Sequence, residues 1–468
     1  ISSGTLLPLM FLVENQIKFF APEFFFASVL LFIVLQNSLI IDNKNYKNPL
    51  LVSITLQISS LTFLTFLGLL LNSCAVNFFM FSESNFIFDT LGLNVKLFLT
   101  FFSIIVFLFC FDHIYETKIN LFEYVFLKLL AVLSLCFLVM ANDLLGIYII
   151  IEIQSLCLYA LASFKRNSAF STEAGIKYFV LGSFASCFLL IGIATIYCSI
   201  GSTNLQDVQY LLTSLNKTIL FFDTINIGLF FIASSFLFKL AIFPFHLWIA
   251  DVYEGSSTSS SIFFSLIPKI AIFVVLIRIF EYSFYSTFYN WESCLSLLAI
   301  FSILYGSFIA IKQKKIKRLL AFSAIAHMGY VLLAFSTSTF EGLESMFFYL
   351  FIYTITGFLT WSIVLILESD FNSNNTKTIA DISNFFKLNF SFSIIIAAAF
   401  FSLAGTPPFV GFYAKLSILC SVINSSSFFY AFVAFLTSVI SCFYYLRIIK
   451  NSFFEKHFEW FSYINFNV

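Results

Sequence analysis

Charged side chains are scarce in this sequence: only 10% of its 468 residues are Asp, Glu, Lys or Arg. Soluble domains carry about 25% charged residues. Here 60% of the residues are hydrophobic, so lipid rather than water is the expected environment. Basic and acidic residues balance at 24 each, which argues against a nucleic acid partner. The composition therefore predicts a protein of the lipid bilayer.

Metal ligands and redox motifs are also lacking. The nine cysteines are scattered mostly through apolar segments without a CxxC pair, and the four histidines are too dispersed for a metal motif. The sequence shows no Gly-rich phosphate loop, nucleophile–base pair or haem-ligand arrangement. We therefore expect no disulfide framework, zinc site or iron–sulfur cluster, and no cofactor bound by this chain.

Long apolar segments make up most of the chain. A membrane-spanning helix needs about 20 mostly apolar residues, and the sequence offers about thirteen such segments. They lie near residues 21–41, 50–71, 94–111, 122–141, 143–163, 173–199, 225–250, 258–282, 292–311, 319–336, 343–368, 388–422 and 427–449. Residues 1–19 are apolar but contain Pro8, Glu14 and Lys18, so we interpret them as an interfacial segment. The expected fold class is an all-α polytopic membrane protein.

Basic residues concentrate in alternate loops. Lys165 and Arg166 follow the fifth predicted span, and the basic run Lys312–Arg318 follows the ninth. Positively charged loops stay on the side of the membrane where the chain is made. These loops are therefore expected to face the cytoplasm or the matrix.

Prolines interrupt two of the predicted spans. Span seven is interrupted at Phe243-Pro244-Phe245 and span twelve at Gly405-Thr406-Pro407-Pro408. Proline removes a backbone donor, so a break at membrane depth must be covered by protein or water. The two spans are five helices apart and run in opposite directions, a pattern typical of inverted repeats around a transport path. The expected segments are 1–115 (interfacial segment and peripheral spans 1–3), 116–285 (first five-helix repeat, spans 4–8), 286–455 (second five-helix repeat, spans 9–13) and 456–468 (C-terminal tail).

A few charged residues lie where hydropathy places the middle of a span, namely Glu152, Lys239, Lys269 and Lys415. A charge at the centre of a membrane helix costs about 2.5–3.5 kcal/mol on insertion scales, so each residue needs a partner, water or a function. Structural ion pairs are one interpretation, with Glu152 and Lys239 as the candidate pair. Three lysines share one central acid, however, so that interpretation leaves two lysines unpaired. We therefore favour a proton relay.

Lysine suits proton transfer because its charge state responds to its surroundings. Desolvation lowers the pKa of a lysine and a nearby carboxylate raises it, so a moving carboxylate can switch a lysine between its protonated and neutral forms. Arginine cannot do this, because it does not deprotonate in proteins. The predicted relay therefore combines the carboxylate of Glu152 with the three buried lysines.

Other ionisable residues allow two interpretations each. Lys177 follows Glu173 by one helical turn, which stabilises any helix, so Lys177 is either a packing residue or a surface proton donor. His327 lies inside the tenth span, where a lone histidine usually only satisfies hydrogen bonds, but its pKa range suits proton exchange and we favour the relay role. Lys128 either snorkels from its helix end or joins the relay, and Arg278 is expected to snorkel.

Seven short segments stand out from the apolar background. They are Glu152-Ile153-Gln154-Ser155-Leu156, Ser171-Thr172-Glu173-Ala174-Gly175-Ile176-Lys177-Tyr178, Phe238-Lys239-Leu240-Ala241-Ile242-Phe243-Pro244-Phe245-His246-Leu247-Trp248, Asp251-Val252-Tyr253-Glu254-Gly255-Ser256, Pro268-Lys269, Lys317-Arg318-Leu319-Leu320-Ala321-Phe322-Ser323 and His327-Met328-Gly329-Tyr330. Together they resemble the chain 2 family of NADH:ubiquinone oxidoreductase, the respiratory complex I, over roughly residues 20–455. Pro-Phe-His-Leu-Trp marks the wider antiporter-like, Mrp-related superfamily, whereas the segments of spans five and six are most similar to mitochondrial chain 2.

The resemblance implies a proton-pumping subunit of the mitochondrial inner membrane, with the positively charged loops in the matrix. The resemblance implies that the central proton-transfer residues are Glu152, Lys239, Lys269 and Lys415, with Lys177 and His327 as further members. The implied partners are the lipid bilayer and the other membrane and peripheral subunits of complex I. NADH, flavin mononucleotide (FMN), iron–sulfur clusters and ubiquinone are expected in those partner subunits.

The sequence departs from the family at two places. A fourteenth helix is usual in the family, and here it is expected either to come from another polypeptide or to be replaced by a different surface. The family's Gly-Ser-Pro-Thr-Pro reads Gly255-Ser256-Ser257-Thr258-Ser259. Three alternatives stay open: a Mrp-type cation/proton antiporter subunit, a scaffold with structural ion pairs, and a plastid homologue in a photosynthetic complex.

Overall fold

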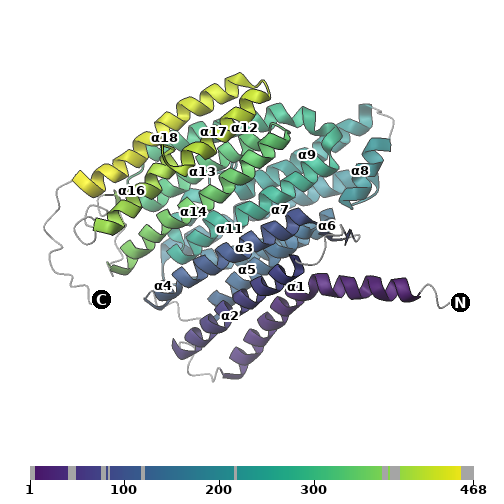
Figure 1. The fold of residues 1–468 in the computed structure, drawn as a ribbon, viewed down its shortest axis with the longest axis horizontal. Coiled ribbons are helices and arrows are strands. Elements are labelled where there is room, and N and C mark those ends of the chain that lie inside the picture. Colours follow the sequence, from purple (N-terminus) through teal and green to yellow (C-terminus); the bar gives the residue numbers. More distant parts are fainter. Residues whose placement is uncertain are drawn as a thin grey trace. The chain divides into compact units, whose positions relative to one another are not determined.

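The computed structural model describes residues 6–40, 49–74, 81–82, 85–116, 122–214, 219–370, 378–379 and 390–454. Within these ranges, twelve helices are long and apolar enough to cross a membrane. Figure 1 shows a fold that consists almost entirely of helices. The expected class of helical, multi-pass membrane protein is thereby confirmed, while the predicted C-terminal tail at 456–468 lies outside the described residues.

The chain forms two compact units, of which the first comprises the residues up to Ala241 and Phe245–Trp291. Its elements are α1 (Leu6–Ile40), α2 (Pro49–Cys74), β1 (Phe81–Ser82), β2 (Ile87–Phe88), α3 (Thr90–Phe109), α4 (Phe111–Glu116), α5 (Phe122–Met140), α6 (Leu144–Ala162), α7 (Ala169–Ile200), α8 (Leu205–Ser214), α9 (Ile219–Leu240), α10 (Ile249–Gly255), α11 (Thr258–Leu276) and the π-helix η1 (Ile277–Ser283). The two short strands pair antiparallel, with Phe81 opposite Phe88. Helix α7 packs on α6, α9 and α10, and α11 packs on α5, α6 and α9.

The second unit comprises Ile242–Pro244 and Glu292–Val468. Its elements are α12 (Tyr285–Lys312, which begins in the first unit), α13 (Ile316–Phe335), α14 (Phe340–Asp370), α16 (Phe390–Ala404), α17 (Val410–Asn424) and α18 (Phe428–Phe454). Helix α14 packs on α13, α16 and α17, and α18 packs on α16 and α17. Helices α13 and α17 also pack on each other. This unit therefore brings the middle of α13 close to α14 and α17.

The structure differs from the predicted spans at two places. The segment predicted as a span with a proline interruption, at 388–422, forms two separate helices, α16 and α17, of 15 residues each, so the described residues hold twelve long apolar helices rather than thirteen. The predicted interfacial segment at 1–19 is helical from Leu6 and continues into the first span as α1. Pro8 lies in the first turn of α1, where proline is tolerated because the missing N–H has no helical partner there. Helix α1 is bent in Figure 1, and it contains Pro22, a residue type that kinks helices.

The helix ends beside the prolines have similar backbone geometry. Helix α9 ends at Leu240, residues 241–248 form turns, and Ala241 has a positive φ of 57°. Helix α16 ends at Ala404, and Gly405 has a φ of 77°. The bonds before Pro244 and Pro408 are both cis. A positive φ ends a helix cleanly, and Gly is the residue that adopts it at least cost.

Two buried ion pairs connect elements of the first unit that are distant in sequence. Glu23 of α1 pairs with Lys96 of α3, and each side chain is 1% exposed. Arg278 donates to both carboxylate oxygens of Asp89 at 2.8 and 2.9 Å and to the Val139 carbonyl at 2.9 Å. The snorkelling expected of Arg278 is therefore wrong, because a carboxylate distant in sequence neutralises its charge inside the protein.

Removing one partner of the Glu23–Lys96 pair is expected to destabilise the protein. The Glu23→Gln variant leaves the Lys96 ammonium buried without its countercharge, which costs about 3–5 kcal/mol for a buried pair. Thermal unfolding of the purified complex measures the effect as a lower midpoint for this chain. The double variant Glu23→Gln/Lys96→Met removes both charges and should recover most of the loss. Equal midpoints for the single and double variants would contradict this account.

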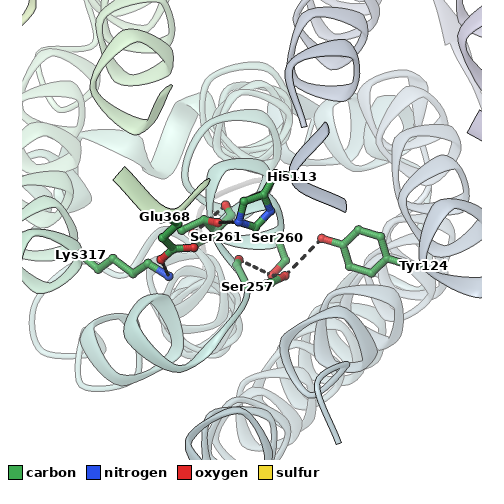
Figure 2. Close-up of polar contacts among 8 residues, drawn as sticks. His113, Tyr124, Ser257, Ser260, Ser261, Lys317 and Glu368 are labelled. Carbon is green, nitrogen blue, oxygen red and sulfur yellow. Dashed lines mark hydrogen bonds and ion pairs between the residues drawn. The ribbon is translucent and has the colours of Figure 1, made fainter. Parts of the chain in front are cut away.

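Lys128 of α5 is also buried, at 2% exposure. Its ammonium donates to the Ser259 carbonyl at 3.1 Å and lies 4.5 Å from the centre of the Tyr124 ring. The Tyr124 hydroxyl lies 2.6 Å from the Ser259 hydroxyl and 3.3 Å from the Ser257 hydroxyl. Ser257 in turn contacts Ser260 at 2.8 Å, and Figure 2 shows Tyr124, Ser257 and Ser260 together. The side chain thus ends in a polar cluster at the start of α11 and does not snorkel.

Candidate functional site

Helix α6 presents Glu152, Ser155 and Tyr159 on one face, because these positions are separated by one helical turn each. The helix begins at an N-cap, where the Asp143 carboxylate accepts a hydrogen bond from the Gly146 N–H at 3.1 Å. The Ser155 hydroxyl lies 3.5 Å from one carboxylate oxygen of Glu152. The other oxygen, Oε1, is buried and has no hydrogen-bond partner among the described residues.

Lys239 lies in the last turn of α9, just before the turns at 241–248. Its ammonium is 3.4 Å from the Tyr159 hydroxyl and 5.6 Å from the centre of the Tyr159 ring. The Trp248 indole N–H donates to the Phe238 carbonyl at 3.0 Å and so satisfies a backbone acceptor at this helix end. Glu152 and Lys239 share no ion pair within 4.0 Å, although both lie in the described part of the chain.

Lys269 follows Pro268 inside α11, the most buried helix of the first unit. Every residue of this helix is buried, and the Lys269 side chain is 3% exposed. Because α11 packs on both α6 and α9, the three helices that carry Glu152, Lys239 and Lys269 pack together within one unit. The structure therefore places three of the four central residues predicted from the sequence on helices that pack together.

Lys177 lies at the surface end of α7 and is 41% exposed. It forms the expected one-turn ion pair with Glu173 at 2.6 Å and a second ion pair with Asp251 of α10 at 2.7 Å. Asp251 was not expected as its partner. Its exposure makes Lys177 a surface group, and surface ion pairs of this kind contribute about 0–1 kcal/mol to stability.

His327 of α13 lies in the interior of the second unit at 5% exposure. Its Nδ1 is 2.7 Å from the Tyr349 hydroxyl and its Nε2 is 2.9 Å from the Tyr445 hydroxyl. A tyrosine hydroxyl can donate or accept, so these partners suit both the neutral and the protonated imidazole. The surroundings therefore allow His327 to change its charge without losing a hydrogen bond.

Lys415 of α17 is 5% exposed and contacts neutral groups. Its ammonium donates to the Ala404 carbonyl at 2.8 Å and to the Ser441 hydroxyl at 3.3 Å, and it lies 5.7 Å from the centre of the Tyr330 ring. Its alkyl chain packs against Gly405, where a Cβ would meet the Lys415 Cδ at 2.8 Å. One cavity is lined by both His327 and Lys415, together with Tyr349, Tyr353, Thr356 and Ser402.

Several tyrosines contact the predicted residues and were not singled out from the sequence. Tyr159 contacts Lys239, and Tyr349 and Tyr445 contact His327. The position of Tyr159 two turns after Glu152 was a usable signal, because it places both on one face of α6. Tyr445 lies 118 residues from His327, so no local pattern could reveal that contact.

Metal ligands do not gather in the described ranges, where no three His, Cys, Asp or Glu side chains lie close enough to hold an ion. The ionisable groups instead form two clusters, one in each unit. In the first, a carboxylate and a lysine face the same tyrosine. In the second, a histidine and a lysine share a cavity. Groups of these types can accept and release protons.

The family model described as NADH:quinone oxidoreductase/Mrp antiporter, TM, matches residues 141–441. Chain 2 of NADH-ubiquinone oxidoreductase from Marchantia polymorpha is 36% identical over 452 residues, which are 96% of this chain and 91% of that protein. Subunit N of NADH-quinone oxidoreductase from Pelagibacter ubique is 36% identical over 445 residues, 95% of this chain and 91% of that protein.

The fold is also similar to that of a chain in respiratory complex I from Thermus thermophilus, solved with bound aureothin. The two structures align with a TM-score of 0.75 at 25% identity, over 93% of this chain and 90% of that chain. The family match at 141–441 runs from before Glu152 to beyond Lys415. The similarity thus includes both clusters of buried ionisable residues.

Proposed function

Because this chain belongs to the NADH:quinone oxidoreductase/Mrp antiporter family, and within it to the chain 2/subunit N group of complex I, we propose that it translocates protons through its buried ionisable residues. It is a membrane subunit of NADH:quinone oxidoreductase. The proposed proton-transfer residues are Glu152, Lys239, Lys269 and Lys415, with His327 and the surface residue Lys177 as further members.

The partners of two lysines, the half-buried Lys239 and the buried Lys415, carry this proposal. Lys239 contacts the neutral hydroxyl of Tyr159, and Lys415 contacts a carbonyl and a hydroxyl. Neither lysine forms an ion pair within 4.0 Å among the described residues. A scaffold built on ion pairs would place carboxylates at these positions, as it does at Lys96. Neutral oxygen partners leave the lysines free to lose and regain a proton.

The proposed mechanism couples this chain to redox chemistry in other subunits. A change of charge at one end of the chain shifts the field of Glu152 relative to Lys239. Lys239 then releases its proton, Lys269 takes it up, and Lys415 receives it next. Moving one elementary charge against 100 mV costs about 2.3 kcal/mol, so the chain requires an outside energy source to pump. NADH, FMN, iron–sulfur clusters and ubiquinone are assigned to partner subunits, and electron transfer there supplies that energy.

We assign the chain to the mitochondrial inner membrane, as one subunit among the membrane and peripheral subunits of complex I. The organellar chain 2 relative and the membrane-spanning helices support this placement. We also propose that 116–285 and 286–455 are inverted five-helix repeats, in which α9–α10 and α16–α17 are the broken spans. The division into two compact units near residue 291 and a lysine beside each interruption support this assignment.

A Mrp-type cation/proton antiporter subunit is the alternative, because the matching family includes such proteins. The purified complex in sealed vesicles distinguishes the two functions. We expect the internal pH of the vesicles to change only when NADH and quinone are present. Without them, we expect no sodium uptake. Sodium flux that is independent of NADH would favour the antiporter.

The Glu152→Gln variant separates proton transfer from a structural role. The charge of Glu152 acts on Lys239 through space, so removing the carboxylate should slow transfer through Lys239 by about 10-fold or more. Assembly should be normal, because within the described ranges Glu152 forms no ion pair and its carboxylate accepts a hydrogen bond only from Ser155. Proton transport per NADH and subunit content are measured together, with the exposed Glu344→Gln as control. Lost assembly with an unchanged proton yield would support the scaffold instead.

A further inference from the structure

Lys239 and Glu152 face the same buried tyrosine without joining each other. Lys239 approaches Tyr159 from its hydroxyl side, at 3.4 Å from the oxygen, and Tyr159 is 7% exposed. Glu152 lies two turns earlier on the same face of α6, with Ser155 between them. The carboxylate keeps one buried oxygen without a hydrogen-bond partner in the described part of the chain. The Glu152 carboxylate therefore offers a nearby acceptor for the Lys239 ammonium. The ammonium contacts the Tyr159 hydroxyl instead.

Helix α7 holds the Tyr159 hydroxyl in place. The Tyr159 ring packs edge-to-face on Phe179 at 5.7 Å between ring centres. A Cβ at Gly182 would lie 1.9 Å from the hydroxyl oxygen, so only a glycine lets α7 come this close. The close approach of α7 therefore limits movement of the hydroxyl on that side.

A hydroxyl and a carboxylate act differently on a lysine that must change its charge. A carboxylate only accepts hydrogen bonds, so it stabilises the ammonium and opposes loss of the proton. A tyrosine hydroxyl accepts from the ammonium and donates to the neutral amine. The hydroxyl can therefore hold Lys239 in the same place before and after proton transfer.

We propose that Tyr159 is a positioning residue for proton transfer, whose hydroxyl keeps Lys239 out of a direct ion pair with Glu152 and binds it in both charge states. The inference rests on the proposed function of the chain. In the transfer step an N–H bond of the Lys239 ammonium breaks and the proton moves to the next acceptor of the relay. Tyr159 keeps its own O–H bond and turns from acceptor to donor, so no proton is stored on it.

The variants Tyr159→Phe and Gly182→Ala test this role in the assembled complex. The first removes the hydroxyl, and the second places a methyl group where the hydroxyl lies. In both, Lys239 becomes free to pair with Glu152 and retains its proton. We expect NADH-driven proton transport to fall about 10-fold at neutral pH. The pH at which transport is half-maximal should rise by about one unit. Transport is measured in vesicles from pH 6 to 10, per assembled complex.

Matched controls separate this effect from a general disturbance of packing. Tyr178→Phe removes another buried tyrosine hydroxyl and keeps a ring that contacts Tyr159 at 4.7 Å between ring centres. Gly146→Ala adds a methyl group to α6, where the nearest atom is 3.7 Å away. Both controls should keep the wild-type pH profile.

Lys239→Ala, measured in parallel, distinguishes two failures. A wild-type pH profile in Tyr159→Phe or Gly182→Ala, with transport lost in Lys239→Ala, would overturn the role of Tyr159 and leave the proposed function intact. A uniform fall without a shift in pH would also overturn it. Undiminished transport in Lys239→Ala would remove the proposed function itself.

Discussion

Replacement of Lys239 by alanine is expected to stop proton transfer through this chain. A positioned acid or base accelerates proton transfer by about 10²- to 10⁴-fold, and alanine offers no group that can take its place. The number of protons moved per NADH oxidised by the assembled complex should therefore fall by the whole share of this subunit. The measurement is proton release from sealed vesicles at a known rate of NADH oxidation.

Lys239→Arg is the informative companion variant. Arginine keeps the positive charge and can still donate to the Tyr159 hydroxyl, but it does not deprotonate. A relay therefore predicts the same loss as in Lys239→Ala, whereas a structural charge predicts that arginine restores the wild-type yield. Lys312→Ala, at an exposed helix end, should have no effect.

Replacement of Lys415 by alanine is expected to have an effect of similar size in the second unit. Lys415 shares a cavity with His327, so the variant removes one of the two basic side chains that line it. Without this group, proton transfer through the unit should slow by about 10²- to 10⁴-fold. Proton yield per NADH is again the measurement.

Two further variants are measured together with Lys415→Ala. Lys450→Ala changes an exposed lysine of α18 and should leave the proton yield unchanged. His327→Gln keeps a side chain that donates and accepts hydrogen bonds but cannot carry a charge, so it should lower the yield if His327 belongs to the relay. A normal yield in Lys415→Ala would exclude Lys415 from the proton path.

The helices of this fold could be predicted because hydropathy and length suffice to identify a span. Twelve of the predicted spans correspond to the twelve long apolar helices in the described ranges, and the segment at 388–422 forms the two shorter ones. That segment contains two adjacent prolines, at which an interruption was predicted because proline removes a backbone donor. Hydropathy alone averages over them and counts the segment as one span. The start of α1 was missed, because Pro8 was interpreted as a break although it lies in a first turn.

The partners of the buried charges could not be predicted, because they come from distant parts of the chain. Glu23 and Lys96 lie at the edges of their apolar segments, where hydropathy does not show whether a charge reaches water. Asp89 lies 189 residues from Arg278, and only the folded chain brings them together. The candidate lysines themselves were visible, since a charge inside an apolar run is conspicuous. The neutral oxygen atoms that contact these lysines could not be identified from the sequence.

A map of ordered water in the assembled complex tests the central claim most directly. Electron cryomicroscopy at a resolution that shows individual waters should reveal water molecules within hydrogen-bonding distance of Lys239, Lys269 and Lys415, joined into chains through the protein interior. Dry surroundings at these three ammonium groups, or side chains directed toward lipid, would contradict a proton relay in this chain.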